Sequence, residues 1–197
     1  RHLMDRAVPD CLVTDYEDGS GLIWTNIAGS GEGGNYTGGT GDCASVSSDE
    51  FGSASYDTYL ISPVMDLAGG VNAKVDFDAN FQNFAGRDYF EVDVSFDGGW
   101  QWTNLLSWNE DHGDLWGPDG EHVSLPLGGA SSATYIRFRY FDPVPHWNWY
   151  AQVDNVVVTV DEFEHSGCGV YMDIKPERCL NVFARRMNSL VPIALLG

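Results

Sequence analysis

The middle of the chain contains the stretch Ala73-Lys74-Val75-Asp76-Phe77-Asp78-Ala79-Asn80-Phe81, in which apolar and polar side chains alternate. Since successive side chains of a β-strand point to opposite faces, this stretch predicts a strand with one buried and one wet face. Alternating or largely apolar runs of strand length recur at residues 58–62, 88–97, 122–127, 135–141 and 151–160. Glycine-rich breaks separate the runs, and no window of about 11 residues has a helical period. We therefore expect an all-β chain that folds as an antiparallel β-sandwich.

Length and charge limit the size and the partners. The 197 residues suffice for one domain of sandwich size, with or without an extension. The formal net charge is −19, from 29 acidic and 10 basic residues. So acidic a surface repels phosphate backbones and anionic lipid, so we expect no nucleic acid partner and no binding to membrane surfaces. No apolar run reaches the roughly 18 residues of a membrane span, so we also expect no membrane insertion.

Composition changes near residue 167, where the acidic part of the chain gives way to a segment with more basic than acidic side chains. We expect residues 1–162 to form the sandwich and residues 163–197 to begin an appended module or a short C-terminal β extension. The sequence stops directly after the apolar run Leu190 to Leu196, which is unusual for a complete domain. We expect the chain to be part of a longer polypeptide.

Two predicted strands carry a carboxylate in phase with their buried side chains. Asp88 has the same parity as the apolar residues of its strand, and Asp154 has the same parity as the valines that follow it. A carboxylate in an apolar layer is costly unless a positive group meets it. Arg137 and Arg139 are out of phase with the apolar residues of their own strand, so we expect them on the other face. A bound cation is then the simplest partner, and oxygen ligands without thiolates favour Ca²⁺.

Two loops between predicted strands combine aromatic and turn residues. Residues 109–121 contain Trp116, and residues 143–149 contain Trp147 and Trp149. Long ordered loops on a rigid sandwich are common binding sites, and tryptophan rings on one rim would suit a sugar or an apolar side chain. Packing of the rings into the core is the alternative.

The loop 109–121 is also the place where an enzyme would find paired carboxylates, as glycoside hydrolysis requires. Glu110 and Asp114 are the candidates. In so acidic a chain a cluster of carboxylates is expected by chance, so we assign no catalytic residues.

The four cysteines, Cys11, Cys43, Cys168 and Cys179, include no CxxC pair. An even count in a chain with few lysines fits a secreted protein with two disulfides. Of the three possible connectivities we expect the local one, Cys168–Cys179 with Cys11–Cys43. Buried free thiols are the alternative.

The stretch Ser95-Phe96-Asp97-Gly98-Gly99-Trp100-Gln101-Trp102 predicts a tight hairpin, because a strand ends in Asp-Gly-Gly and an aromatic stretch follows. It resembles the Asp-box of sialidases and other secreted β-proteins, in which the aspartate caps the amides of its own hairpin. The resemblance implies a structural role in an extracellular β-fold.

Five pieces of sequence occur in an order that resembles the MAM-like and cleaved-adhesin jelly-roll domains of secreted bacterial peptidases and surface proteins. They are Tyr16-Glu17, Tyr56-Asp57-Thr58-Tyr59-Leu60-Ile61-Ser62-Pro63, Arg87-Asp88-Tyr89-Phe90-Glu91-Val92, Ile136-Arg137-Phe138-Arg139-Tyr140 and Val153-Asp154-Asn155-Val156. The resemblance spans about residues 12–160 and implies an antiparallel jelly-roll β-sandwich.

Domains of this kind often hold a structural cation on an early glutamate and on acidic residues of later strands. Carried over to this chain, the resemblance implies Glu17, Asp57 and Asp154 as ligands of Ca²⁺, together with Asp88. Asn155 stands where the family pattern has a second aspartate, which leaves one possible ligand fewer.

The sequence and the resemblance together predict a calcium-binding, non-catalytic accessory domain of a secreted or cell-surface protein. Its expected role is adhesion, or recognition of a carbohydrate or protein ligand at the rim with Trp116, Trp147 and Trp149. Two alternatives stay open. One is a jelly-roll polysaccharide-degrading enzyme, either a glycosidase or a lyase, and the other is a structural spacer beside a protease domain.

Overall fold

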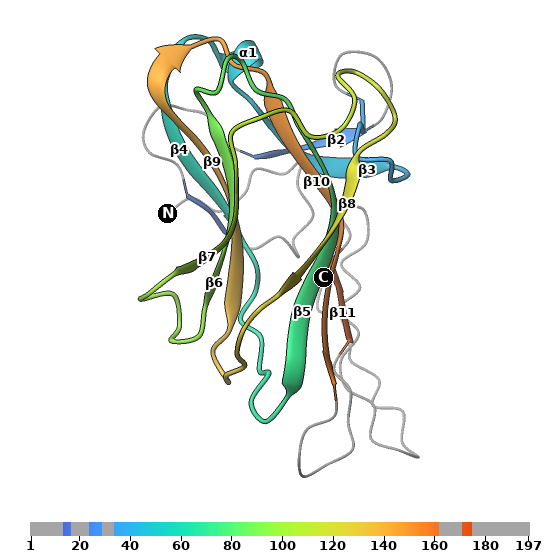
Figure 1. The fold of residues 1–197 in the computed structure, drawn as a ribbon, viewed down its shortest axis with the longest axis vertical. Coiled ribbons are helices and arrows are strands. Elements are labelled where there is room, and N and C mark those ends of the chain that lie inside the picture. The colour runs from blue at the N-terminus through green and yellow to red at the C-terminus, as the bar shows by residue number, and fades with distance from the viewer. Residues whose placement is uncertain (1–13, 17–23, 29–33, 162–170, 175–197) are drawn as a thin grey trace.

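In the computed structural model, which describes residues 14–16, 24–28, 34–161 and 171–174, two antiparallel sheets pack face to face (Figure 1). Sheet A has the strand order β1 (Thr14–Tyr16), β4 (Ala54–Ile61), β9 (Tyr135–His146), β6 (Tyr89–Ser95) and β7 (Thr103–Trp108). Sheet B has the order β2 (Thr25–Ala28), β3 (Asp42–Ser47), β10 (Tyr150–Asp161), β5 (Val71–Phe81) and β8 (Glu121–Pro126). The strand β11 (Tyr171–Ile174) also pairs with β10.

The all-β sandwich expected from the sequence is therefore confirmed, and each predicted strand has its counterpart. The sequence did not identify β3, whose residues Asp42–Ser47 are small or polar, and it implied β7 only through the predicted hairpin, since β7 begins at Thr103, directly after the aromatic stretch. The one helix among the described residues, α1 (Ser48–Phe51), has four residues. No described helix is long and apolar enough to cross a membrane.

The core lies between the two sheets and is built from aromatic rings of both. Phe77 of sheet B packs edge-on against Phe138 of sheet A at 5.2 Å between centroids. Phe90 lies beside both Phe138, at 6.2 Å, and Phe81, at 6.0 Å. All four rings are buried, as the alternating pattern of their strands predicts.

A β-bulge in β10 overturns the parity expected for Asp154. The register runs from Asp154 opposite Asp78 to Val157 opposite Asp76, so β10 contains one residue more than β5. The extra residue is Asn155, whose φ of +52° lies in the left-handed region. Because a bulge changes which face the next side chain takes, Asp154 points to the outer face of sheet B while the following valines point into the core.

The bulge can be tested by two substitutions that both remove the Asn155 amide, which donates to Asp78 Oδ2 at 2.8 Å. We expect Asn155→Ala to be less stable than Asn155→Gly by about 1–2 kcal/mol, because only glycine takes the left-handed conformation without a steric penalty. Urea unfolding of both variants measures the difference. Equal stability would show that the backbone at this position is not held at positive φ.

Candidate functional site

The end of the sandwich beside α1 contains two carboxylates that face inward. Tyr89 of β6 pairs with Phe141 of β9. Asp88 directly precedes Tyr89 and Asp142 directly follows Phe141, so the two aspartates come next to each other across the paired strands. Both side chains are 0% exposed. Asp88 therefore lies where its parity predicts. Asp142 was not identified from the sequence, although it continues the inward parity of Ile136, Phe138 and Tyr140.

A chain of hydrogen bonds connects the two carboxylates. Tyr140 Oη lies 2.9 Å from both Asp88 Oδ2 and Ser48 Oγ, and its single proton can be donated to one of them at a time. Ser48 Oγ in turn donates to the carbonyl of Asn148 and accepts from the Asn148 backbone nitrogen at 3.0 Å. Asn148 Nδ2 donates to Asp142 Oδ2 at 2.7 Å, which closes the connection.

Two oxygens of this cluster are buried without a hydrogen-bond partner in the described part of the chain, Asp88 Oδ1 and Asn148 Oδ1. Burial raises the pKa of Asp88 from 3.8 to about 6 and also raises the pKa of Asp142. Unpartnered buried oxygens beside two carboxylates are groups of the kind that coordinate a hard cation. All donors are oxygens, which fits Ca²⁺, although the described residues contain no group of three histidine, cysteine or acidic side chains that could hold a metal.

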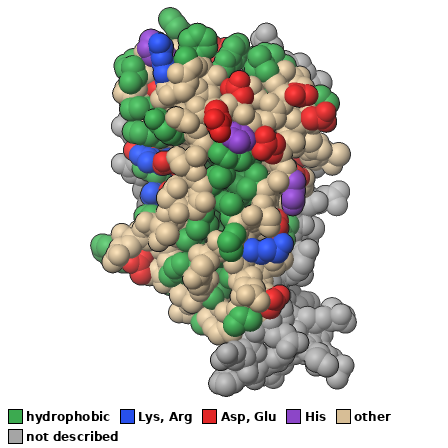
Figure 2. Space-filling model, viewed as in Figure 1, with side chains coloured by type: hydrophobic (Ala, Val, Ile, Leu, Met, Phe, Trp, Pro, Cys, Tyr) green, Lys and Arg blue, Asp and Glu red, His purple; other side chains and the backbone are tan. Residues whose placement is uncertain are grey.

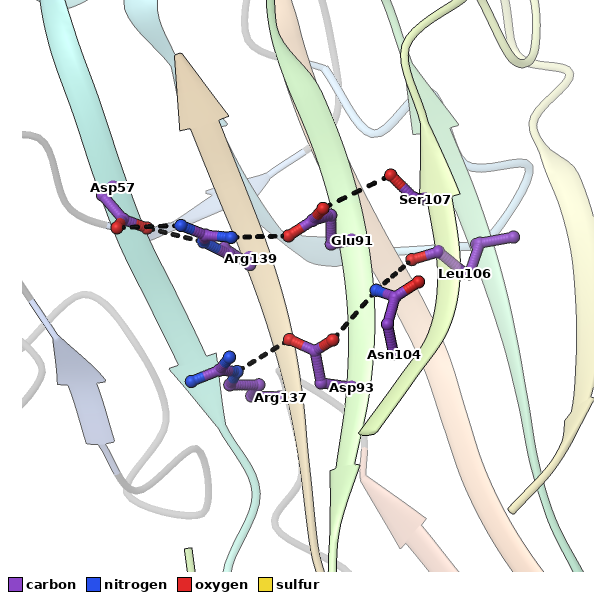
Figure 3. A network of polar contacts seen from close by, with 8 residues as sticks. All are labelled: Asp57, Glu91, Asp93, Asn104, Leu106, Ser107, Arg137 and Arg139. Carbon is purple, nitrogen blue, oxygen red and sulfur yellow. Dashed lines mark hydrogen bonds and ion pairs between the residues drawn. The ribbon is translucent and has the colours of Figure 1, made fainter. Parts of the chain in front are cut away.

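The structure does not bring Asp57 to this cluster. Asp57 lies on the outer face of sheet A, where its carboxylate accepts from Arg139 Nε at 2.6 Å and from Arg139 Nη2 at 2.9 Å (Figure 3). Arg139 Nη1 also donates to Glu91 at 2.7 Å, and Arg137 Nε donates to Asp93 at 2.8 Å. The expectation that both arginines face away from the core is thus confirmed.

Asp154 is also apart from the cluster, on the outer face of sheet B. Its Oδ2 accepts from Asn35 Nδ2 at 2.9 Å and its Oδ1 from the backbone nitrogen of Asn155 at 2.7 Å. A Cβ on Gly39 would come within 2.0 Å of Asp154 Oδ2, so the loop containing Gly39 is pressed onto the carboxylate. Asp154 is buried by this loop and not by the core. Glu17 lies outside the described residues and stays a prediction.

Of the four cysteines, the structure describes Cys43. Cys43 is a buried free thiol, so the predicted Cys11–Cys43 disulfide is not formed in the structure. Burial, and then the nearby charge of Asp154, raise the pKa of the Cys43 thiol, which makes it a poor nucleophile. Cys11, Cys168 and Cys179 lie outside the described residues.

The predicted rim is an aromatic cluster at the outer face of sheet B. The ring of Trp116 lies 5.6 Å from Tyr36, 5.5 Å from Trp149 and 5.1 Å from Tyr150 between centroids. Trp116 has a φ of +56°, and its backbone nitrogen donates to the Tyr150 hydroxyl at 3.2 Å. Nevertheless 43% of Trp116 is exposed.

Trp147 does not join this cluster through any ring contact of the described residues. It is 63% exposed and lies near α1, where a Cβ on Gly52 would be 3.9 Å from its Nε1. The structure therefore places Trp116 and Trp149 together, and Trp147 apart from them.

The acidic loop 109–121 is held onto sheet B by backbone and amide bonds. Phe81 and His112 form an isolated bridge, with nitrogen-to-oxygen distances of 2.9 and 2.8 Å. Buried amides then bind loop carbonyls: Asn80 Nδ2 donates to Asp114 and Gln82 Nε2 to Gly113. Of the two catalytic candidates, Glu110 lies 4.0 Å from His112 Nε2 and Asp114 shapes the loop through its backbone.

The hairpin after β6 has the capping expected of an Asp-box. Asp97 Oδ1 accepts from the backbone nitrogens of Trp100 at 3.0 Å and Gln101 at 2.9 Å. These bonds, the Gln101 amide above all, lower the pKa of Asp97.

Comparison with known proteins gives the fold. No family model matches the chain, and no curated protein matches it. Among solved structures it is similar to the K3 cleaved adhesin domain of Lys-gingipain from Porphyromonas gingivalis W83, with a TM-score of 0.51 and 22% identity over 74% of this chain and 90% of that one.

The K2 cleaved adhesin domain of Lys-gingipain has a TM-score of 0.50 and 20% identity over 73% of this chain and 87% of that chain. The carbohydrate-binding module TmCBM61, solved with β-1,4-galactotriose, has a TM-score of 0.47 and 7% identity over 82% of this chain and 99% of that chain. The two adhesin domains show that this chain has a cleaved-adhesin-like jelly-roll fold, as the sequence resemblance implies.

The buried carboxylate predicts an unusual pH dependence in the absence of metal. Because the pKa of Asp88 is raised in the folded state, the native chain binds a proton there between about pH 4 and 6 that the unfolded chain has released. Stability should fall as pH rises through this window, by about 3 kcal/mol for the complete shift. Urea unfolding in the presence of a chelator measures the profile.

The control for this profile is the difference between variants, since other carboxylates also titrate. Asp88→Asn should remove the loss of stability between pH 4 and 6, while Asp119→Asn, on an exposed loop position, should leave it. Parallel profiles for the wild type and Asp88→Asn would contradict the assignment.

Proposed function

We propose that this chain is a non-catalytic recognition domain of a secreted or cell-surface protein, stabilised by Ca²⁺, that binds carbohydrate or protein. The observation that carries the proposal is the display of tryptophan rings on loops fixed to a rigid sandwich. Trp116 is 43% exposed in a loop anchored by buried amides, and Trp147 is 63% exposed beside α1. Rings held in place lose little entropy when a ligand covers them.

The proposed ligand rim consists of Trp116 and Trp149 with Tyr36 and Tyr150 beneath them. The cluster combines apolar ring surfaces with a polar group, the Tyr150 hydroxyl. This hydroxyl accepts from the Trp116 backbone nitrogen and so fixes the position of Trp116. Trp147 lies apart from this cluster, near α1, and presents a separate exposed ring. The cleaved-adhesin-like fold supports a role outside the cell, since the similar domains come from Lys-gingipain.

The proposed calcium site is the buried cluster of Asp88, Asp142 and Asn148, with Glu17 as a further ligand from outside the described residues. Asp57 and Asp154 are left out of this set because each is paired elsewhere, Asp57 with Arg139 and Asp154 with Asn35. When bound, the ion would compensate the inward-facing carboxylates and join β6 to β9. Its role is structural, since the cluster is fully buried.

We expect calcium to raise the melting temperature of the chain and a chelator to lower it. Calcium at 100 times its dissociation constant adds about 2.7 kcal/mol to stability by mass action. Asp142→Asn should abolish most of this response, and Asp154→Asn should keep it. Thermal unfolding with and without CaCl₂ measures both. Loss of the response in Asp154→Asn alone would restore the ligand set inferred from the sequence.

We expect the chain to bind without turnover when it is tested against cellulose, xylan, mannan and galactan, and against purified collagen and fibronectin. Trp116→Ala and Trp147→Ala should reduce binding with an unchanged melting temperature, measured by affinity electrophoresis and biolayer interferometry. A decrease of about 3–5 kcal/mol in the free energy of unfolding would instead mean that the rings pack as core residues do. Release of sugar that Glu110→Gln or Asp114→Asn abolishes would establish the hydrolytic alternative in place of this proposal.

A further inference from the structure

The outer face of sheet A contains a pocket of about 500 Å³ that the proposed rim does not include. It lies beside the β6–β7 hairpin, which projects from the body of the molecule and has hydrophobic atoms at its tip (Figures 1 and 2). The lining residues come from β4, β9 and this hairpin, namely Asp57, Tyr59, Ile61, Gly98, Gly99, Trp102, Tyr135 and Arg137. The volume is within the range of small-molecule sites.

One wall of the pocket is an arginine held between two rings. The Cζ atom of Arg137 lies 4.6 Å from the centroid of Tyr59 and 4.3 Å from that of Trp102. Its Nε donates to Asp93, which fixes the plane of the guanidinium (Figure 3). The Nη groups of Arg137 have no hydrogen-bond partner in the described part of the chain. A rigid, planar set of donors therefore remains available at the pocket.

The hairpin beside the pocket displays a second ring. Trp100 is 88% exposed, more than any other large apolar side chain of the described residues. It is held there by the Asp97 cap and by Gly98 and Gly99, whose φ values of +82° and +90° only glycine adopts easily. A rigid turn that presents a bare indole next to a pocket indicates a binding surface.

We propose that this pocket binds a residue of a neutral saccharide. Sugar rings have apolar C–H faces that suit the rings of Trp100 and Trp102, and hydroxyls that accept from Arg137 and bond the hydroxyl of Tyr135. An anionic ligand is disfavoured because Asp57 lines the pocket and Asp93 already compensates Arg137. A cationic ligand is disfavoured because Arg137 itself fills the space between Tyr59 and Trp102.

This site is distinct from the rim proposed above, and the two depend on different residues. The probes are cellohexaose, xylohexaose, mannohexaose and β-1,4-galactohexaose, with oligogalacturonate as the anionic comparison, measured by isothermal titration calorimetry. We expect at least one neutral hexasaccharide to bind and oligogalacturonate to bind more weakly than it. Trp100→Ala and Trp102→Ala should each weaken that binding by tenfold or more, whereas Phe84→Ala, which removes an exposed ring outside both the pocket and the rim, should not.

A footprint on the wild-type chain covers the case in which Trp102→Ala disturbs the hairpin. Oxidation by N-bromosuccinimide, read by peptide mass spectrometry, should be slowed by the bound hexasaccharide at Trp100 and Trp102. Absence of binding to all four neutral probes would overturn the proposal, and so would preferential binding of oligogalacturonate. Protection or affinity loss at Trp116 and Trp147 alone would also overturn it, while supporting the rim.

Discussion

Two carboxylates that face the inside of a β-sandwich impose the strongest physical demand in this molecule. Asp88, directly before β6, and Asp142 of β9 flank the pair formed by Tyr89 and Phe141, and both are fully buried. Tyr140, Ser48 and Asn148 connect them, and yet Asp88 Oδ1 has no partner in the described part of the chain. Neighbouring buried carboxylates repel each other and lose hydration, so either protons or a cation must compensate them. The cluster therefore couples the integrity of this end of the fold to pH, and the proposed Ca²⁺ would couple it to metal as well.

The polar and charged side chains on the two outer faces of the sandwich find their partners in different ways. On sheet A, charges are paired within the face: Arg139 joins Asp57 to Glu91, and Arg137 meets Asp93 (Figure 3). This arrangement leaves the face open, with a pocket at its edge. On sheet B, loops cover the polar side chains, as where Asn35 meets Asp154. The proposed rim on sheet B is therefore built from the covering loops, whereas the proposed pocket on sheet A uses the sheet itself.

Alternation of side chains was enough to predict the sandwich and the inward position of Asp88, because Asp88 directly precedes β6 and the pairing of β6 with β9 is regular throughout. It failed at Asp154, since one extra residue at Asn155 changes the parity of everything after it. The resemblance placed Asp57 among the metal ligands, but Asp57 pairs with Arg139, which lies diagonally from it on β9. Pairing between distant strands cannot be read from either strand alone.

Asp142 was missed although it continues the parity of its strand, and Trp102 was overlooked as a site residue because its neighbour Arg137 is 35 residues away in the chain. The same limit applies to Trp147, which shares a loop with Trp149 but not its contacts. Local patterns thus predicted elements and faces, while the composition of each site depended on register between strands.

A crystal structure of the chain grown with CaCl₂, with anomalous data collected at long wavelength, would show directly whether Ca²⁺ occupies the buried cluster. We expect an anomalous peak within about 2.3–2.6 Å of Asp88 Oδ1 and of an Asp142 oxygen. A basic side chain seated against Asp88, or a calcium peak on Asp57 and Asp154 with none at Asp88, would contradict it.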